Sequence, residues 1–69
     1  MLTPIKTFYA GSIPAYEQWE EAVQIAKTEK CVVEVRWMPN SWTGWYHEYV
    51  FEDSNPLKLF ERTPRVYGV

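Results

Sequence analysis

Residues 13–38 read IPAYEQWEEAVQIAKTEKCVVEVRWM, and the spacing of their apolar side chains changes within this stretch. Up to residue 30 the apolar positions recur every three or four residues, which is the period of an amphipathic helix. From Cys31 the period is two, which is typical of a strand with one buried face. The apolar stripe of the predicted helix comprises Tyr16, Trp19, Val23 and Ala26, with Ala22 and Ile25 at its flanks.

The polar residues around the predicted helix agree with its direction. Ser12 is a good capping residue, and Pro14 suits a first helical turn. Acidic side chains lie in the N-terminal half, while Lys27 and Lys30 lie near the C-terminal end, so both signs of charge favour the helix dipole. The sequence therefore predicts a helix capped by Ser12 and followed by a strand.

Two alternating runs, residues 31–38 and 45–52, predict a β-hairpin around a loop at residues 40–44. Its register is argued from charge, because Arg36 opposite Glu48 forms a cross-strand ion pair. A slip of two residues would instead place two glutamates opposite each other. The inward face of the first strand is predicted to carry Cys31, Val33, Val35 and Trp37, with Tyr49 from the second strand beside Val35.

The remaining segments are short. Residues 5–10 have the composition of a strand. Residues 57–62 fit one or two helical turns or a short strand, and residues 65–69 fit an edge strand. The predicted order is β-α-β-β followed by a short C-terminal helical turn or edge strand. We therefore expect an α+β fold in which one amphipathic helix packs on a small, mostly antiparallel sheet.

The length of the chain sets limits on how it is stabilised. Its 69 residues are expected to form a single small domain over residues 1–69. Ordering them costs on the order of 100 kcal/mol of conformational entropy, which dense apolar burial or self-association must offset. A lone cysteine excludes an internal disulfide, and one cysteine with one histidine cannot complete a structural zinc site. Aromatic residues make up 17% of the chain and can supply this burial.

The charge of the chain is small and evenly spread. Seven basic and nine acidic residues give a formal net charge of -2, and the pI is near 5.2. This balance argues against a polybasic binder, whose affinity depends on clustered Lys and Arg. No secretory signal is recognisable, and no apolar run exceeds three residues, so we expect a cytoplasmic protein with no membrane partner. Chains of this size without such motifs are common among bacterial and phage accessory proteins.

The sequence contains no recognisable catalytic set. In the predicted register His47 lies roughly 20 Å from Cys31, which is too far for a nucleophile and its base. The three glycines form no phosphate-binding loop, and no serine lies in a nucleophile elbow. We therefore expect no enzymatic activity, no metal and no cofactor.

Residues 36–46, RWMPNSWTGWY, hold three of the four tryptophans. Trp42 lies in the predicted loop and is expected to be partly exposed, although a loop tryptophan can also fold back as a lid over the sheet. Trp45 and Tyr46 point to opposite faces, so only one of them joins the core. Trp, Tyr, Met and Arg are enriched at binding hot spots. The candidate binding residues are Arg36, Met38, Trp42, Trp45 and Tyr46.

These residues suggest a non-enzymatic intracellular interaction module that forms a homodimer or docks on a larger protein. The alternative is a single-stranded nucleic-acid binder that stacks bases on Trp42 and Tyr46, while the backbone is contacted by Arg36, Lys58, Arg62 or Arg65. The acidic pI disfavours that alternative. A third class, sugar recognition by aromatic rings near Asn40, usually acts outside the cell.

Overall fold

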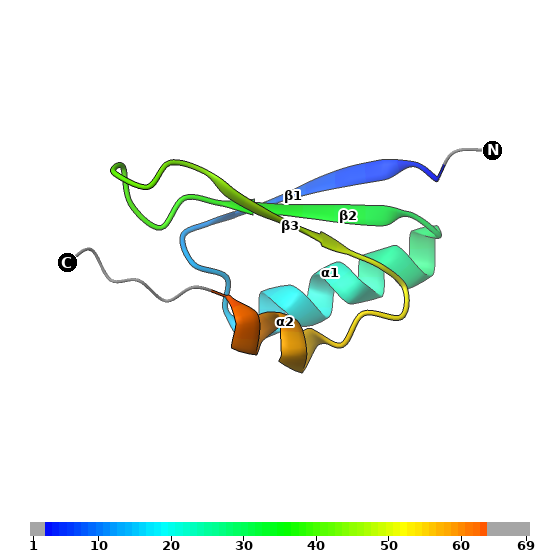
Figure 1. Cartoon of the computed structure of the whole chain (residues 1–69). Helices are drawn as coiled ribbons and strands as arrows, with labels where there is room; N and C mark the ends of the chain where they lie inside the picture. The colour runs from blue at the N-terminus through cyan, green and yellow to red at the C-terminus, as the bar shows by residue number, and fades with distance from the viewer. Residues whose placement is uncertain (1–2, 64–69) are drawn as a thin grey trace.

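The computed structural model describes residues 3–63, which form two helices and a three-stranded sheet (Figure 1). In chain order the elements are β1 (Ile5–Gly11), α1 (Tyr16–Glu29), β2 (Val32–Trp37), β3 (Tyr46–Val50) and α2 (Pro56–Arg62). This order agrees with the predicted β-α-β-β sequence and with an α+β fold.

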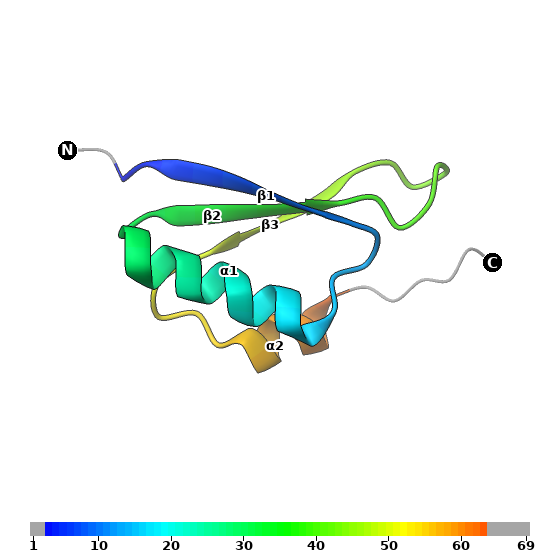
Figure 2. The same cartoon turned by 180° about the vertical axis from the view of Figure 1, so that it is seen from behind.

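The helices and the sheet form two layers. The strand order is β1-β2-β3, so β2 is the central strand. Both α1 and α2 lie on the same side of the sheet, as Figure 1 and the reverse view in Figure 2 show. No segment within residues 3–63 covers the other side of the sheet.

The sheet is mixed, which corrects the expectation of a mostly antiparallel sheet. β1 pairs with β2 in parallel, whereas β2 and β3 form the predicted antiparallel hairpin. The cause is the connection between the strands, because α1 carries the chain back along the sheet before β2 begins. A crossover of this kind joins parallel neighbours, while a short loop joins antiparallel ones.

Helix α1 buries the predicted stripe but begins later than predicted. Trp19, Ala22, Val23 and Ala26 are its buried residues. The prediction of Ser12 as the cap is wrong, because Ala15 is still extended (φ -77°, ψ 165°) and is itself the cap residue. Its N–H donates to Oε1 of Gln18 at 2.8 Å, so a side chain inside the first turn satisfies this backbone donor.

The core lies between α1 and the sheet. Val33, Val35 and Trp37 alternate into it from β2, as predicted, and Val50 and Leu59 complete it from β3 and α2. Trp19 and Trp37 meet nearly edge to face, with ring centroids 5.7 Å apart and an interplanar angle of 84°. Two buried indoles therefore fill much of the core of this small domain.

The register of the hairpin differs by one residue from the predicted register. Arg36 pairs with His47 and not with Glu48. Because side chains alternate along a strand, a shift of one residue exchanges the two faces of β3. Val50 is therefore fully buried in the core, while Tyr49 lies on the opposite face with 43% of its surface exposed.

The charged partners explain why the predicted register is wrong. Glu48 pairs with Arg62 of α2, and Glu34 pairs with His47 across the hairpin at 3.1 Å. The ion pair that was expected between two strands is thus replaced by one between a strand and α2. A register that is chosen only from the charges within the hairpin cannot take this contact with α2 into account.

The segment after the hairpin contains a second helix. The structure therefore decides between helix and strand for residues 57–62 in favour of helix. Asn55 caps α2, because its Oδ1 accepts a hydrogen bond from the Leu57 N–H at 2.9 Å, and Pro56 follows in the first turn. The predicted edge strand at residues 65–69 lies outside the described residues.

Candidate functional site

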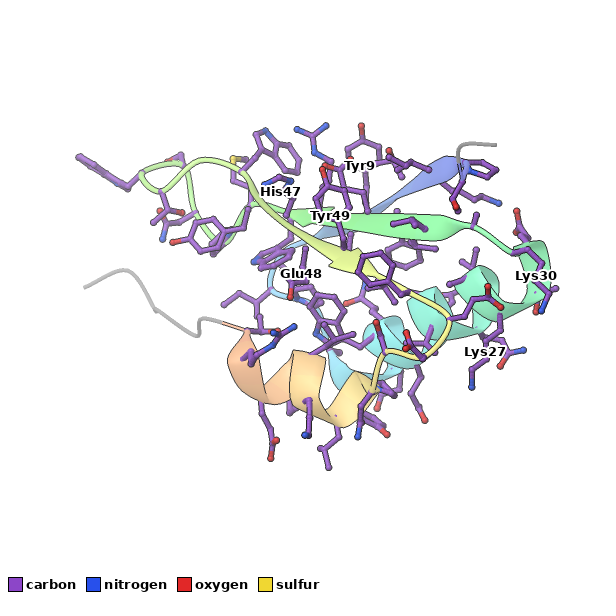
Figure 3. The ribbon with its side chains drawn as sticks, turned by 45° about the vertical axis from the view of Figure 1, so that its right-hand side comes forward. Tyr9, Lys27, Lys30, His47, Glu48 and Tyr49 are labelled. Carbon is purple, nitrogen blue, oxygen red and sulfur yellow. The ribbon has the colours of Figure 1, made fainter. Side chains whose placement is uncertain are left out.

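The uncovered side of the sheet is rich in aromatic side chains, and we call it the open face. Strand pairing and alternation place two sets of residues there, one from β1 and β2 and one from β3 and its flanks. The open face comprises Ile5, Thr7, Tyr9, Val32, Glu34, Arg36, Trp45, His47, Tyr49 and Phe51. Figure 3 shows Tyr9, His47 and Tyr49 on this side, whereas Glu48 points toward α2.

The register arranges the open face in rows across the three strands. Tyr9 pairs with Arg36, and Arg36 pairs with His47, so these side chains form one row. In the next row Glu34 lies between Thr7 and Tyr49 in the same way. One cation and one anion therefore lie on the central strand with rings beside them.

Arg36 is the centre of an aromatic cluster on the open face. Its guanidinium carbon lies 5.8 Å from the ring centroid of Tyr9 and 5.8 Å from that of Trp45, which is within range of cation–π attraction. The two rings lie edge to face, 6.2 Å apart. The Nε atom of Arg36 is buried and has no hydrogen-bond partner among the described residues. The cation is thus held by rings and lacks an acceptor at this atom.

His47 links the two rows of the open face. Its Nδ1 lies 3.1 Å from Oε2 of Glu34, and its ring lies 5.5 Å from that of Tyr49, close to edge-on. The Glu34 side chain is only 19% exposed. These contacts fix the positions of the His47 and Tyr49 rings within the protomer.

The hairpin loop extends past the helices in both views (Figure 1, Figure 2). Asn40 shapes it, because its Oδ1 accepts hydrogen bonds from the Trp42 and Thr43 N–H groups at 2.8 and 3.0 Å. Gly44 has a positive φ of 75°, which a glycine adopts without steric cost. Trp42 is 95% exposed at this loop, so the lid alternative is wrong and the predicted exposure is confirmed.

The structure brings together only some of the residues proposed from the sequence. Arg36 and Trp45 are neighbours on the open face. Met38 follows the end of β2 and is half-buried, and Trp42 lies out on the loop. Tyr46 lies on the helix side of β3, where its ring is 5.8 Å from that of Trp37. Tyr46 therefore belongs to the margin of the core and not to the open face.

Sequence reasoning missed several residues of this face. Tyr9 and Phe51 are 63% and 50% exposed, and neither was a candidate. Tyr49 was expected in the core because the predicted register of the hairpin was wrong by one residue. Alternation within residues 5–10 already separates Tyr9 from Phe8, but only the pairing of β1 with β2 shows that Tyr9 lies beside Arg36.

A cavity of about 240 Å³ lies on the other side of β3, next to α2. Trp19, Trp37, Tyr46 and Leu59 supply its apolar wall, and the paired Glu48 and Arg62 also line it. The Nε1 atoms of Trp19 and Trp37 are buried and have no hydrogen-bond partner among the described residues. Because these atoms are shielded from solvent, a ligand in the cavity would not reach them, and the charged Glu48 and Arg62 in its wall already pair with each other.

The structure separates the one cysteine from the one histidine. Cys31 is 5% exposed and belongs to the core, whereas His47 lies on the open face. These two groups therefore do not form a nucleophile and base. Within residues 3–63 no three His, Cys, Asp or Glu side chains are grouped so that they could hold a metal ion.

Comparison with known proteins assigns no relative to this chain. No family model, no curated protein and no solved structure matches it. Neither helix in the described part of the chain is long and apolar enough to cross a membrane.

Proposed function

We propose that the chain is a non-enzymatic protein-interaction module and that the open face is its binding surface. The observation that carries this proposal is the contrast between the two sides of one sheet. The side under the helices is buried, whereas Ile5, Tyr9, Trp45 and Phe51 on the other side are each at least half exposed. A contiguous exposed apolar patch with polar groups inside it is typical of an interaction site.

The composition of the open face also fits a protein partner. Tyr, Trp and Arg are the residue types that dominate hot spots, and here Tyr9, Trp45 and Arg36 contact one another. Their mutual contacts reduce the side-chain entropy that binding would otherwise cost. The intracellular location that we expect for this module remains a prediction.

Nucleic-acid binding receives less support from the geometry. Arg36 is the one Lys or Arg that strand pairing places on the open face within residues 3–63. Lys58 and Arg62 lie on α2, on the other side of the sheet, and Arg65 lies outside the described residues. Tight binding to the phosphate backbone of a nucleic acid requires several cationic side chains along one surface. An oligonucleotide that quenches tryptophan fluorescence at low salt would favour this alternative.

The proposal is tested by photo-crosslinking in the cells that produce the protein. Phe51 and Leu57 are each 50% exposed, but Phe51 lies on the open face and Leu57 lies on α2. A photoreactive phenylalanine analogue at position 51 should form specific protein adducts, and Trp45→Ser in the same chain should remove most of them. The analogue at position 57 is the matched control. Equal adducts from both positions, or none from position 51, would contradict the proposal.

A further inference from the structure

We propose that the open face binds a second copy of this chain, face to face, through reciprocal ion pairs between Arg36 and Glu34. This inference rests on the proposed function, since it names the partner of the same surface. It starts from the Arg36 guanidinium, which contacts two rings but has no acceptor for its buried Nε among the described residues. The Nε atom itself is shielded, so a carboxylate from outside the protomer would pair with the terminal nitrogens of this guanidinium.

The charge of the open face is balanced within the central strand. Glu34 and Arg36 lie in neighbouring rows of β2 and point to the same side. Strand pairing places no other Lys, Arg, Asp or Glu on this face within residues 3–63. A strongly acidic or basic partner would match one of these groups and repel the other. A second copy carries one group of each sign at the same spacing, so it can match both.

Symmetry decides how the two copies meet. A two-fold axis that lies between the sheets and crosses β2 at right angles, between residues 34 and 36, places Glu34 of each protomer opposite Arg36 of the other. An axis parallel to β2 would place Arg36 opposite Arg36 and Glu34 opposite Glu34. Like charges in an interface are costly, so the crossed axis is selected.

The same axis also matches the aromatic residues. His47 and Tyr49 of β3 lie in the rows of Arg36 and Glu34, so the rotation brings His47 close to Tyr49 of the partner subunit. Trp45 and Phe51, one step further out at each end, meet in the same way. Each exposed ring of β3 therefore faces a ring, and the edge-to-face contacts that stabilise such pairs become available.

The size of the open face suits a stable dimer. The Cα atoms of the protomer span 42 × 22 × 14 Å, so the sheet is one of the two broad sides of a thin molecule. A standard protein interface covers roughly 800 Å² on each partner, so the dimer would use most of this broad side, including its exposed rings. Two sheets packed face to face share side chains across about 10 Å, as in a β-sandwich.

The test is charge exchange, measured by sedimentation of the full chain from micromolar to millimolar concentration. The wild type should dimerise, and Arg36→Glu or Glu34→Arg alone should weaken dimerisation by roughly tenfold or more, because each places like charges opposite each other. An equimolar mixture of the two variants should dimerise again, since both contacts are then between opposite charges. Lys27→Glu makes the same change of charge as Arg36→Glu, but it does so on α1, away from the open face. This control should leave the dimer unchanged (Figure 3).

Each outcome separates the dimer from the proposed function. A wild type that stays monomeric at millimolar concentration overturns the dimer, but adducts from position 51 to another protein would still support the open face as an interaction surface. A dimer that neither single variant weakens, or a mixture that does not re-form it, overturns this arrangement. If a single variant fails to fold, the double variant with both Arg36→Glu and Glu34→Arg is measured in its place. It should dimerise like the wild type, because both contacts are again between opposite charges.

Discussion

At the scale of single residues, the four tryptophans have different environments despite their shared chemistry. Trp19 and Trp37 are 1% and 3% exposed in the core, whereas Trp45 and Trp42 are 53% and 95% exposed. Trp37 and Trp42 are only five positions apart in the sequence. Local composition therefore says little about which indole stabilises the fold and which is available to a partner.

This difference predicts opposite results for two alanine substitutions. Trp37→Ala should lower the free energy of unfolding by about 3–5 kcal/mol, because it leaves a cavity beside Trp19. Trp42→Ala should change it by less than about 0.5 kcal/mol, since the ring is exposed. Urea unfolding followed by circular dichroism measures both. Equal losses would mean that Trp42 packs on the domain, and Trp37→Phe gives a milder test if Trp37→Ala does not fold.

At the scale of elements, the ends of α1 depend on backbone conformation as much as on side-chain caps. Lys30 ends the helix in the left-handed region, with φ 54° and ψ 50°, and its N–H donates to the Ala26 carbonyl. Glycine is the usual residue in this conformation because it has no Cβ to clash. The lysine keeps an ion pair with Glu52, but both side chains are at least half exposed, so that pair stabilises the fold only weakly.

Lys30→Gly is therefore expected to raise the free energy of unfolding by about 0.5–1 kcal/mol. Lys27→Gly, the same change within the last turn of α1, should lower it by about 1 kcal/mol, because glycine is a poor residue inside a helix. Thermal and urea unfolding of the two variants measure the difference. A loss of stability in Lys30→Gly would show that the pair with Glu52 outweighs the backbone strain.

At the scale of the whole molecule, a two-layer domain leaves one side of its sheet without a covering layer. α1 and α2 cover one side, and no segment within residues 3–63 covers the other. The apolar side chains of the open face therefore remain exposed in the protomer. Association with a second copy would supply the missing layer from outside the chain.

Fluorine NMR of protein labelled with fluorotryptophan can measure whether the open face becomes covered when the protein associates. In dilute samples a soluble paramagnetic agent should broaden the signals of Trp42 and Trp45 and spare those of Trp19 and Trp37. As the concentration rises, Trp45 should become protected, because it lies on the proposed dimer face, while Trp42 stays accessible on the loop. Trp42→Phe and Trp45→Phe assign the two exposed signals. Protection of Trp42 without protection of Trp45 would place the contact at the loop.

The sequence alone determined the features that depend on local periodicity. The apolar stripe of α1, the inward residues of β2, the existence of the hairpin and the exposure of Trp42 were all predictable, because each follows from side-chain spacing or from a loop. Arg36 and Trp45 were proposed as binding residues from their residue types, and the structure places them beside each other. The placement of Tyr49 in the core was wrong, since it depended on a register chosen from charges within the hairpin.

Tertiary structure alone decided the parallel pairing of β1 with β2, the register of β3 and the composition of the open face. Each depends on contacts between distant residues. The return path of α1 makes the first pairing parallel, and Arg62 of α2 pairs with Glu48 on the helix side of β3. A shift of one residue changes few local preferences but exchanges the two faces of a strand. Burial of Val50 and exposure of Tyr49 are thus properties of the packed molecule.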